Sequence, residues 1–298
     1  MIEYEKELNQ EQYRVVMEAS GPLLVLAGAG SGKTRTLTYR VARLLESGVR
    51  PEEILLATFT NKAARAMLHR VESLGNCYTG KIVGGTFHSI SHRFLRSYAF
   101  RLGYQNHFSI VDSEDARQII AQAMHELKID AKTAKFPKSN ILSEMISLTV
   151  NTGNSLEEVI ASRYPFFRHL SQELHQIACL YTQKKKALNV MDFDDLLANC
   201  CRLLREHPDV LQTLSSRFRH VLVDEYQDTN LLQAEILDLL ASGHRNLMVV
   251  GDDSQSIYSF RGANFENIIR FPERYPDCKI FKLETNYRST PEILHLAN

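Results

Sequence analysis

Short apolar runs recur along the chain, and each is followed by a polar turn and a segment with helical periodicity. The runs cover residues 23–26, 54–59, 82–86, 221–223, 247–250 and 280–283. Continuous apolar runs of this length are typical of strands buried on both faces, and strands that alternate with helices form parallel sheets. We therefore predict an α/β fold in which helices flank a parallel sheet.

Between residues 90 and 210 this alternation stops. Segments 113–127, 139–149, 170–186 and 192–206 have helical patterns, and Asp112 and Asp192 stand where helix N-caps are expected. The pattern predicts an all-helical subdomain at 90–210. It would be inserted into a discontinuous α/β domain made of residues 1–89 and 211–298.

Composition agrees with a globular chain and narrows its setting. The 298 residues are 44% hydrophobic, and 35 Lys and Arg balance 35 Asp and Glu, so net charge gives no hint of a partner. Five cysteines without a C-x-x-C pair indicate neither a disulfide framework nor a zinc site. With no apolar stretch of membrane-spanning length and no signal layout at the N-terminus, we predict a cytoplasmic protein without membrane contact.

A glycine-rich turn joins the first apolar run to a helical segment. It consists of Ala27, Gly28, Ala29, Gly30, Ser31, Gly32, Lys33 and Thr34. This is a P-loop in its required context, strand then turn then helix, although alanine replaces the first glycine of the pattern. Backbone N–H groups would surround phosphate oxygens, Lys33 would neutralise the β- and γ-phosphates, and the Thr34 hydroxyl would hold Mg²⁺. The loop predicts binding of ATP with Mg²⁺.

Two carboxylates follow the apolar run at 221–223. Asp224 suits Mg²⁺ through water, and Glu225 is placed to take a proton from the attacking water. Alone, such a pair is more often an ordinary strand end, but beside a P-loop it indicates a Walker B site. Beyond the next run, Gln255 is a candidate sensor of the γ-phosphate.

These motifs together give the chain a family resemblance. Segments 8–12, 58–64, 85–88, 224–230, 251–263 and 286–289 stand in the order of motifs Q, Ia, Ib, II, III and IV. With the P-loop, they resemble the UvrD/Rep superfamily 1A DNA helicases from residue 8 to residue 290. The resemblance implies a RecA-like P-loop NTPase domain, called 1A, and a helical insertion, called 1B.

The same resemblance implies an ATP-driven motor that would move 3′ to 5′ on single-stranded DNA and separate duplex, in DNA repair or replication. Gln12 would read adenine, Tyr287 would stack on it, and Arg35 would lie near the base. Arg288 would contact the γ-phosphate, and Gln255 would couple hydrolysis to DNA. The implied DNA contacts are Phe59, Asn61, Lys62, Thr86, Phe87, His88, Tyr258, Phe260 and Arg261.

Charge patterning supports a DNA face independently. Between residues 61 and 101, seven basic residues accompany a single acid, Glu72, and they are Lys62, Arg65, Arg70, Lys81, Arg93, Arg96 and Arg101. Interleaved aromatic residues could stack bases, although the part at 93–101 fits a solvated helix face with core aromatics equally well. We interpret a second basic run, residues 184–186, as a solvated helix face, with duplex contact as the alternative. Phe260 stands where family members usually have tryptophan, which predicts a weaker grip on the strand.

The chain stops just beyond motif IV, so we expect an N-terminal motor lobe whose partners are the C-terminal domains 2A and 2B, single-stranded DNA and its junction with duplex. A monomer that hydrolyses ATP poorly by itself is expected. Two alternatives stay open: the helicase part of an AddA/RecB-type helicase-nuclease, and a nucleotide-gated DNA-binding module without turnover. A P-loop ATPase outside the helicases would not explain segments 86–88 and 251–263.

Overall fold

The computed structural model describes residues 2–18, 20–75, 78–129, 136–252 and 266–289. The chain forms two compact units, which we call unit 1 and unit 2. Unit 1 consists of residues 1–90 and 208–298, and unit 2 consists of residues 91–207. Unit 1 carries the P-loop and the carboxylates that follow the apolar run at 221–223.

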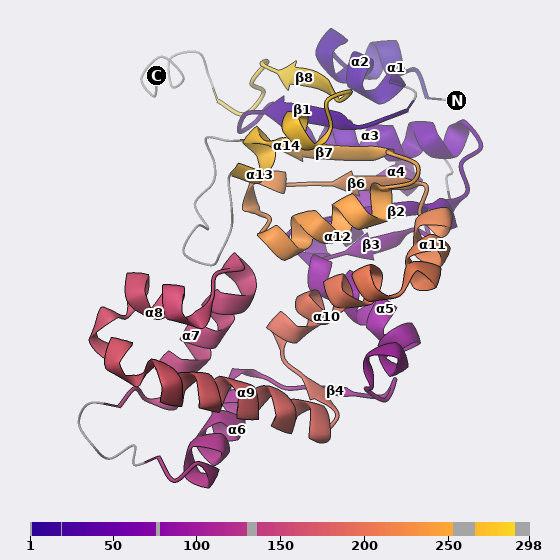
Figure 1. Ribbon diagram of the computed structural model, residues 1–298. Coiled ribbons are helices and arrows are strands. Elements are labelled where there is room, and N and C mark those ends of the chain that lie inside the picture. Colours follow the sequence, from indigo (N-terminus) through magenta and orange to yellow (C-terminus); the bar gives the residue numbers. More distant parts are fainter. Residues whose placement is uncertain (1, 19, 76–77, 130–135, 253–265, 290–298) are drawn as a thin grey trace. The chain divides into compact units, whose positions relative to one another are not determined.

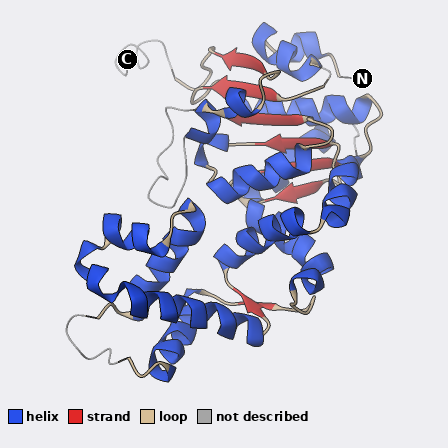
Figure 2. Ribbon diagram, viewed as in Figure 1, coloured by secondary structure: helices blue, strands red, loops and turns tan. Residues whose placement is uncertain are grey.

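A parallel sheet forms the centre of unit 1, as the sequence predicted (Figure 2). Its strands are β1 (Leu23–Ala27), β2 (Ile54–Ala57), β3 (Val83–Gly85), β6 (His220–Val223), β7 (Leu247–Gly251) and β8 (Lys279–Leu283). Their order is β3-β2-β6-β7-β1-β8, and every neighbouring pair is parallel. The expected α/β fold is therefore confirmed.

Helices cover both faces of this sheet, with α3 and α4 on the face opposite α12 (Figure 1). The described helices that lie in unit 1 or start there are α1 (Tyr4–Glu7), α2 (Gln10–Met17), α3 (Lys33–Glu46), α4 (Asn61–Gly75), α5 (Phe87–Tyr98), α11 (Pro208–Arg217), α12 (Leu231–Ala241), α13 (Glu266–Ile269) and α14 (Phe271–Arg274). Short 3₁₀ turns are η1 (Pro51–Glu53) and η4 (Tyr226–Asp228). Within the described ranges, no helix has both the length and the apolar character needed to cross a bilayer.

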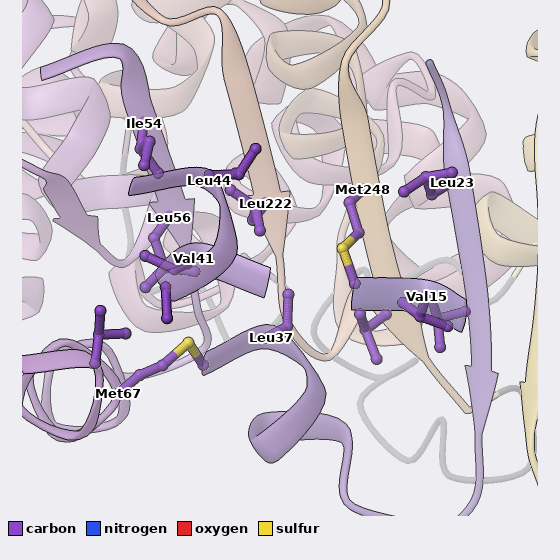
Figure 3. Packing of buried hydrophobic residues seen from close by; sticks show 14 of the residues in the cluster. Val15, Leu23, Leu37, Val41, Leu44, Ile54, Leu56, Met67, Leu222 and Met248 are labelled. Atoms are coloured by element: carbon purple, nitrogen blue, oxygen red, sulfur yellow. The ribbon is translucent and has the colours of Figure 1, made fainter. Parts of the chain in front are cut away.

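One large apolar cluster fixes α3 and α4 against the sheet (Figure 3). Strand residues two apart, such as Leu23 and Val25, point to the same face and meet Leu37 and Val41 of α3. Met67 of α4 closes the cluster on the β2 side. Burial of each such side chain stabilises the fold by roughly 1.5–3 kcal/mol, so the cluster holds the start of α3 firmly against the end of β1.

The strand register gathers several loops at one edge of the sheet. Val223 pairs with Ala57 and Val249, and Leu26 pairs with Gly251. Because all strands are parallel, their carboxyl ends lie along the same edge, where ligands of open α/β sheets bind. The P-loop, the residues after β6 and Asp252 after β7 therefore lie along this edge.

Unit 2 is built mainly of helices around its own apolar cluster, which includes Ile120, Met145 and Ile177. Its helices beyond α5 are α6 (Ser113–Glu126), α7 (Ser139–Thr152), α8 (Leu156–Arg163), α9 (Ser171–Ala187) and α10 (Phe193–Glu206), with 3₁₀ turns η2 (Ala99–Leu102) and η3 (Pro165–Leu170). Asp112 and Asp192 cap α6 and α10 as predicted. The expectation of an all-helical subdomain is wrong in one detail, because β4 (Ser109–Ile110) and β5 (Val190–Met191) form a small parallel pair. Strands of two residues are too short to show an alternating pattern.

The middle lysine of the 184–186 run is buried, so the sequence interpretation of a solvated helix face is wrong for that residue. Lys185 is 3% exposed, and its Nζ lies 2.5 Å from Asp192 Oδ2 and 2.6 Å from Asp195 Oδ2. Tyr181 donates its hydroxyl to Asp192 at 2.7 Å. Burial alone would lower the pKa of Lys185, but the two carboxylates raise it above its usual value. Lys185 is therefore a structural cation that ties α9 to the start of α10.

Replacing Lys185 with methionine is expected to lower the free energy of unfolding by about 3 kcal/mol at pH 7, because two buried carboxylates lose their cation. The loss should shrink at pH 5, where the carboxylates can take up protons. Urea denaturation at both pH values measures it. Lys184→Met is the matched control, since Lys184 pairs with the exposed Glu126 and should change stability by less than about 0.5 kcal/mol. Equal losses in the two variants would contradict a structural role for Lys185.

Candidate nucleotide-binding site

The P-loop connects β1 to α3 in a conformation that requires glycine at two positions. Gly30 and Gly32 have φ values of 77° and 87°, in the left-handed region that side chains disfavour. Gly32 is the N-cap of α3 and offers no side-chain cap, so the first N–H groups of the helix are left for a ligand. Ala27, which replaces the first glycine of the pattern, is the last residue of β1 and is buried in the core cluster. The alanine methyl group is accommodated there because it packs with strand residues.

Lys33 faces the carboxylate of Glu225 across the site. Its Nζ lies 3.2 Å from Glu225 Oε2, yet this buried atom makes no hydrogen bond among the described residues. A buried ammonium group without hydrogen-bond acceptors is costly, and a phosphate oxygen would supply them. The uncapped helix start and the unsatisfied Lys33 Nζ fit the phosphate groups of a nucleoside triphosphate.

The two carboxylates after β6 differ in their surroundings. Asp224 continues the sheet by donating its N–H to Ala57 O at 3.0 Å, and its side chain is buried. Burial, followed by the charge of Glu225, raises the pKa of Asp224 to about 6. Glu225 has a left-handed backbone, with φ 52° and ψ 48°, and its side chain is about one third exposed. This turn directs the Glu225 carboxylate toward Lys33.

A magnesium ion fits the neighbourhood of Asp224. Mg²⁺ is usually held by one or two carboxylates together with phosphate oxygens and water, so a complete protein cage is not required. The described residues contain no group of three or more His, Cys, Asp or Glu side chains able to hold a metal ion by themselves. Thr34, in the first turn of α3, is half-buried. A cation beside Asp224 would offset the cost of its buried charge.

Replacing Asp224 with asparagine is expected to stabilise the nucleotide-free chain above pH 6. The folded state holds a proton on Asp224 up to about pH 6, whereas the unfolded state loses it near pH 4. The free energy of unfolding therefore falls as pH rises through this window, by up to roughly 3 kcal/mol. Asparagine does not ionise and so does not lose this stability. The variant should therefore have a higher free energy of unfolding than the unaltered chain at pH 7.5 but not at pH 3.5. Denaturant titrations at the two pH values measure it, and an advantage that does not change with pH would contradict the assignment.

Two neighbours of Glu225 enter the site that sequence reasoning did not single out. Gln227 Nε2 donates to Glu225 Oε2 at 2.8 Å, and its Oε1 accepts from the backbone N–H of Asp252 at 3.0 Å. Asp228 is a third carboxylate here, and burial, followed by the charge of Glu225, raises its pKa to about 6. The sequence could have indicated both residues, because Gln227 and Asp228 lie inside motif II, two and three residues beyond Glu225.

The Q-motif residues hold the P-loop from the side of α2. Asn9 caps α2, and Gln12 completes the capping box by accepting from the Asn9 N–H. Gln12 is 2% exposed, and its Nε2 donates to Ser31 O at 3.1 Å. A Cβ atom at Gly32 would lie 2.6 Å from that nitrogen, so Gly32 is needed for this approach. Both ends of the Gln12 amide therefore contact protein atoms.

The segment after β8 lies directly on the P-loop. Asn286 Nδ2 donates to Ala29 O at 2.7 Å, and the Tyr287 N–H donates to Gly30 O at 2.9 Å. The Tyr287 side chain is 60% exposed, and its hydroxyl accepts from Asn9 Nδ2 at 2.8 Å. A Cβ atom at Gly30 would lie 2.6 Å from the Cβ of Arg288. The structure thus brings Tyr287 and Arg288 to the P-loop, although residues such as Asn286 and Ala29 are 257 residues apart in the sequence.

Arg35 projects from the first turn of α3 and is engaged with α1. Its guanidinium contacts the Glu7 carboxylate at 3.0 Å and lies over the ring of Tyr39, 4.9 Å from the ring centroid. Tyr39 also donates its hydroxyl to Glu7 at 3.0 Å. This exposed ion pair links α1 to α3 at the border of the loop.

The predicted DNA contacts fall into three groups. Phe59, Asn61 and Lys62 are exposed, and Thr86 and His88 are half-buried. Asn61 Oδ1 accepts from the Thr86 N–H at 3.1 Å, which joins motifs Ia and Ib in one patch. Phe87 is only 7% exposed, so its ring offers no open face for a base. Tyr258, Phe260 and Arg261 lie outside the described residues, and so does Gln255, the candidate sensor of the γ-phosphate.

The basic residues counted between 61 and 101 are all exposed, and they are Lys62, Arg65, Arg70, Lys81, Arg93, Arg96 and Arg101. Phe94 is a core residue at 3% exposure, whereas Phe100 is 56% exposed. Arg96 lies over the ring of Phe108 and donates to Asn106 O at 3.0 Å, so it has a structural contact within unit 2.

The described cysteines Cys179, Cys200, Cys201 and Cys278 are free thiols.

The fold and the loop between β1 and α3 place the chain among the P-loop proteins. Its residues 8–276 match the family described as "UvrD/REP helicase N-terminal domain", and the chain belongs to this family of ATP-dependent DNA helicases. The ATP-dependent DNA helicase PcrA of Staphylococcus aureus (strain Mu50 / ATCC 700699) is 40% identical over 292 residues, which cover 98% of this chain and 39% of that protein. PcrA of Staphylococcus epidermidis (strain ATCC 12228 / FDA PCI 1200) is 41% identical over 294 residues, which cover 98% of this chain and 40% of that protein. The chain thus spans about two fifths of the length of these curated relatives.

Proposed function

We propose that the chain is the N-terminal motor lobe of an ATP-dependent DNA helicase, with unit 1 as domain 1A and unit 2 as domain 1B. The lobe binds MgATP and single-stranded DNA in the cytoplasm, and it contributes to 3′ to 5′ movement together with C-terminal domains 2A and 2B. The observation that carries the proposal is the buried Lys33 Nζ, which lacks hydrogen bonds beside an uncapped helix and faces Glu225 at 3.2 Å.

In this proposal the P-loop residues 27–34 bind the triphosphate through backbone N–H groups and Lys33. Thr34 and Asp224 would hold Mg²⁺, which neutralises charge on the phosphate oxygens when it is bound. Glu225 accepts the proton of the attacking water, Gln255 senses the γ-phosphate, and Arg288 contacts it. Tyr287 stacks on adenine with its exposed ring. Gln12 and Arg35 border the base, and the amide of Gln12 would have to exchange its bond to Ser31 to read adenine directly.

The proposed DNA contacts in the described part of unit 1 form the patch of motifs Ia and Ib. In this patch Phe59 can stack on a base. The residues that contact the sugar-phosphate backbone of the DNA are Asn61, Lys62, Thr86 and His88. Exposed basic residues on α4 extend this patch, and such contacts make binding salt-dependent. Phe87 supports the patch from the core side. Tyr258, Phe260 and Arg261 stay predictions from the sequence.

Equilibrium binding of labelled oligo(dT) and of a fluorescent ATP analogue with Mg²⁺ tests the proposal. Both ligands should bind, and the oligo(dT) affinity should fall as salt rises. A strand-displacement assay on these 298 residues should show little unwinding, because closure on the nucleotide would also need the proposed domains 2A and 2B. Absence of nucleotide binding would contradict the site, and efficient unwinding by these 298 residues would contradict the assignment as a single lobe.

The alternative of a nucleotide-gated module without turnover has less support. A binding module would not need a carboxylate directed at the Lys33 ammonium by a left-handed backbone turn, and such turns cost about 1 kcal/mol or more for a residue with a side chain. The arrangement of Glu225 favours a chain that takes part in hydrolysis.

A further inference from the structure

The side chain of Gln227 connects the two carboxyl-terminal strand ends of the candidate site. It is 1% exposed, in η4 directly after Glu225. Its Nε2 donates to Glu225 Oε2 at 2.8 Å, and its Oε1 accepts from the Asp252 N–H at 3.0 Å. A side-chain amide donates through its NH₂ group and accepts through its carbonyl oxygen, so it can join two partners on opposite sides. Gln227 thus joins the residue after β6 to the residue after β7.

Gly251, the last residue of β7, leaves the space that this connection needs. A Cβ atom there would lie 2.6 Å from Gln227 Oε1 and 3.3 Å from the Gln227 backbone nitrogen. It would also lie 2.8 Å from Ile268 Cδ1, so an added side chain would press on a side chain of α13 as well as on the Gln227 amide. The absence of a side chain at residue 251 is therefore matched to the amide of Gln227.

The carboxylate oxygen that Gln227 contacts is also the one that faces the nucleotide loop. Glu225 Oε2 lies 3.2 Å from Lys33 Nζ and 2.8 Å from Gln227 Nε2. A phosphate bound by Lys33 would compete with Glu225 for the ammonium group. The position of Glu225 then depends more strongly on Gln227, and a shift of this carboxylate is passed to the amide and to the Asp252 N–H.

We propose that Gln227 is a positioning residue that couples occupation of the phosphate site to the backbone at Asp252, where the sequence segment with Gln255 and Phe260 begins. The inference rests on the proposed function, because it assigns the phosphate to Lys33. It adds a mechanical connection between motifs II and III that runs through one buried amide. Energetic coupling between two sites can be carried by a shared element that makes different contacts in the two states.

The test uses a fluorescent reporter in the segment after Asp252. The chain contains no tryptophan, so Phe260→Trp introduces a single one. A non-hydrolysable ATP analogue with Mg²⁺ should change its emission, and displacement of a fluorescent nucleotide measures affinity separately. In this background, Gln227→Leu, Gln227→Glu and Gly251→Ala should each reduce the emission change at saturating nucleotide by about fivefold or more. Nucleotide affinity should change far less than the emission response.

Gln233→Leu is the matched control, because Gln233 accepts from the Asn230 N–H in the capping box of α12, away from Glu225. Gln233→Leu should keep the full emission change of the reporter. Thermal melts show which variants fold. The three test substitutions disturb the same contact by different means, so the test does not depend on any one of them. A full response in the folded Gln227 variants would overturn the proposal, and so would a silent reporter in a parent chain that binds nucleotide. A parent chain that binds no nucleotide would instead contradict the proposed function.

Discussion

Replacing Glu225 with glutamine is expected to lower ATP turnover in the presence of single-stranded DNA by about 10²–10⁴-fold, because a glutamine amide cannot accept the proton of the attacking water. MgATP should still bind, since Lys33, Thr34 and Asp224 are untouched. Loss of the negative charge also removes the ion pair that holds Lys33 at 3.2 Å, so nucleotide affinity should stay equal or rise. Steady-state turnover at saturating DNA, with calorimetric titration of the nucleotide, measures the two effects separately.

Glu52→Gln is the matched control for this substitution. Glu52 lies in η1, immediately before β2, at the edge of the sheet opposite the candidate site. Glu52→Gln removes one negative charge from unit 1, as Glu225→Gln does, but it should leave ATP turnover unchanged. If Glu225→Gln turned over as fast as Glu52→Gln, Glu225 would not be the base.

Replacing Lys33 with methionine is expected to weaken MgATP binding by about 10²–10³-fold. Methionine keeps most of the length and the apolar stem of lysine but offers no charge to the phosphates, and loss of one partner of a buried charge-assisted contact costs roughly 2–5 kcal/mol. Nucleotide displacement measures the affinity, and a thermal melt shows whether the variant folds. Folding should be preserved, because the buried ammonium makes no hydrogen bond in the described protein.

Lys6→Met serves as the control, because Lys6 is largely exposed and pairs with Glu3, the N-cap residue of its own helix α1. Its nucleotide affinity should equal that of the unaltered chain. A similar small loss in both lysine variants would mean that Lys33 acts through general charge, and the phosphate assignment would fail.

The sheet and the P-loop could be predicted from sequence because each depends on local pattern. Buried strands need continuous apolar runs, and β1 was found from such a run followed by glycines. The Asp112 and Asp192 caps were also local, since an N-cap acts on N–H groups two or three residues ahead. Periodicity therefore located these elements without knowledge of the tertiary fold.

Contacts between distant segments account for what the sequence did not indicate. The run of three lysines indicates a solvated face, and only the folded contact between α9 and the start of α10 shows that Lys185 meets Asp192 and Asp195. The connection from Gln227 to Asp252 depends on the register of β6 against β7. The resemblance implies a DNA contact for Phe87, but the ring of this first residue of α5 is buried. Counts of charged and aromatic residues do not show whether a given side chain points into the core or into solvent.

The measurement that tests the account most directly is steady-state ATP turnover by this chain with and without oligo(dT). If unit 1 is a motor lobe, turnover should be slow but should rise when oligo(dT) is added, and the rise should disappear in Glu225→Gln. Turnover that is the same with and without oligo(dT), under conditions where both ligands are bound, would contradict the account and leave a nucleotide-gated DNA-binding module in its place.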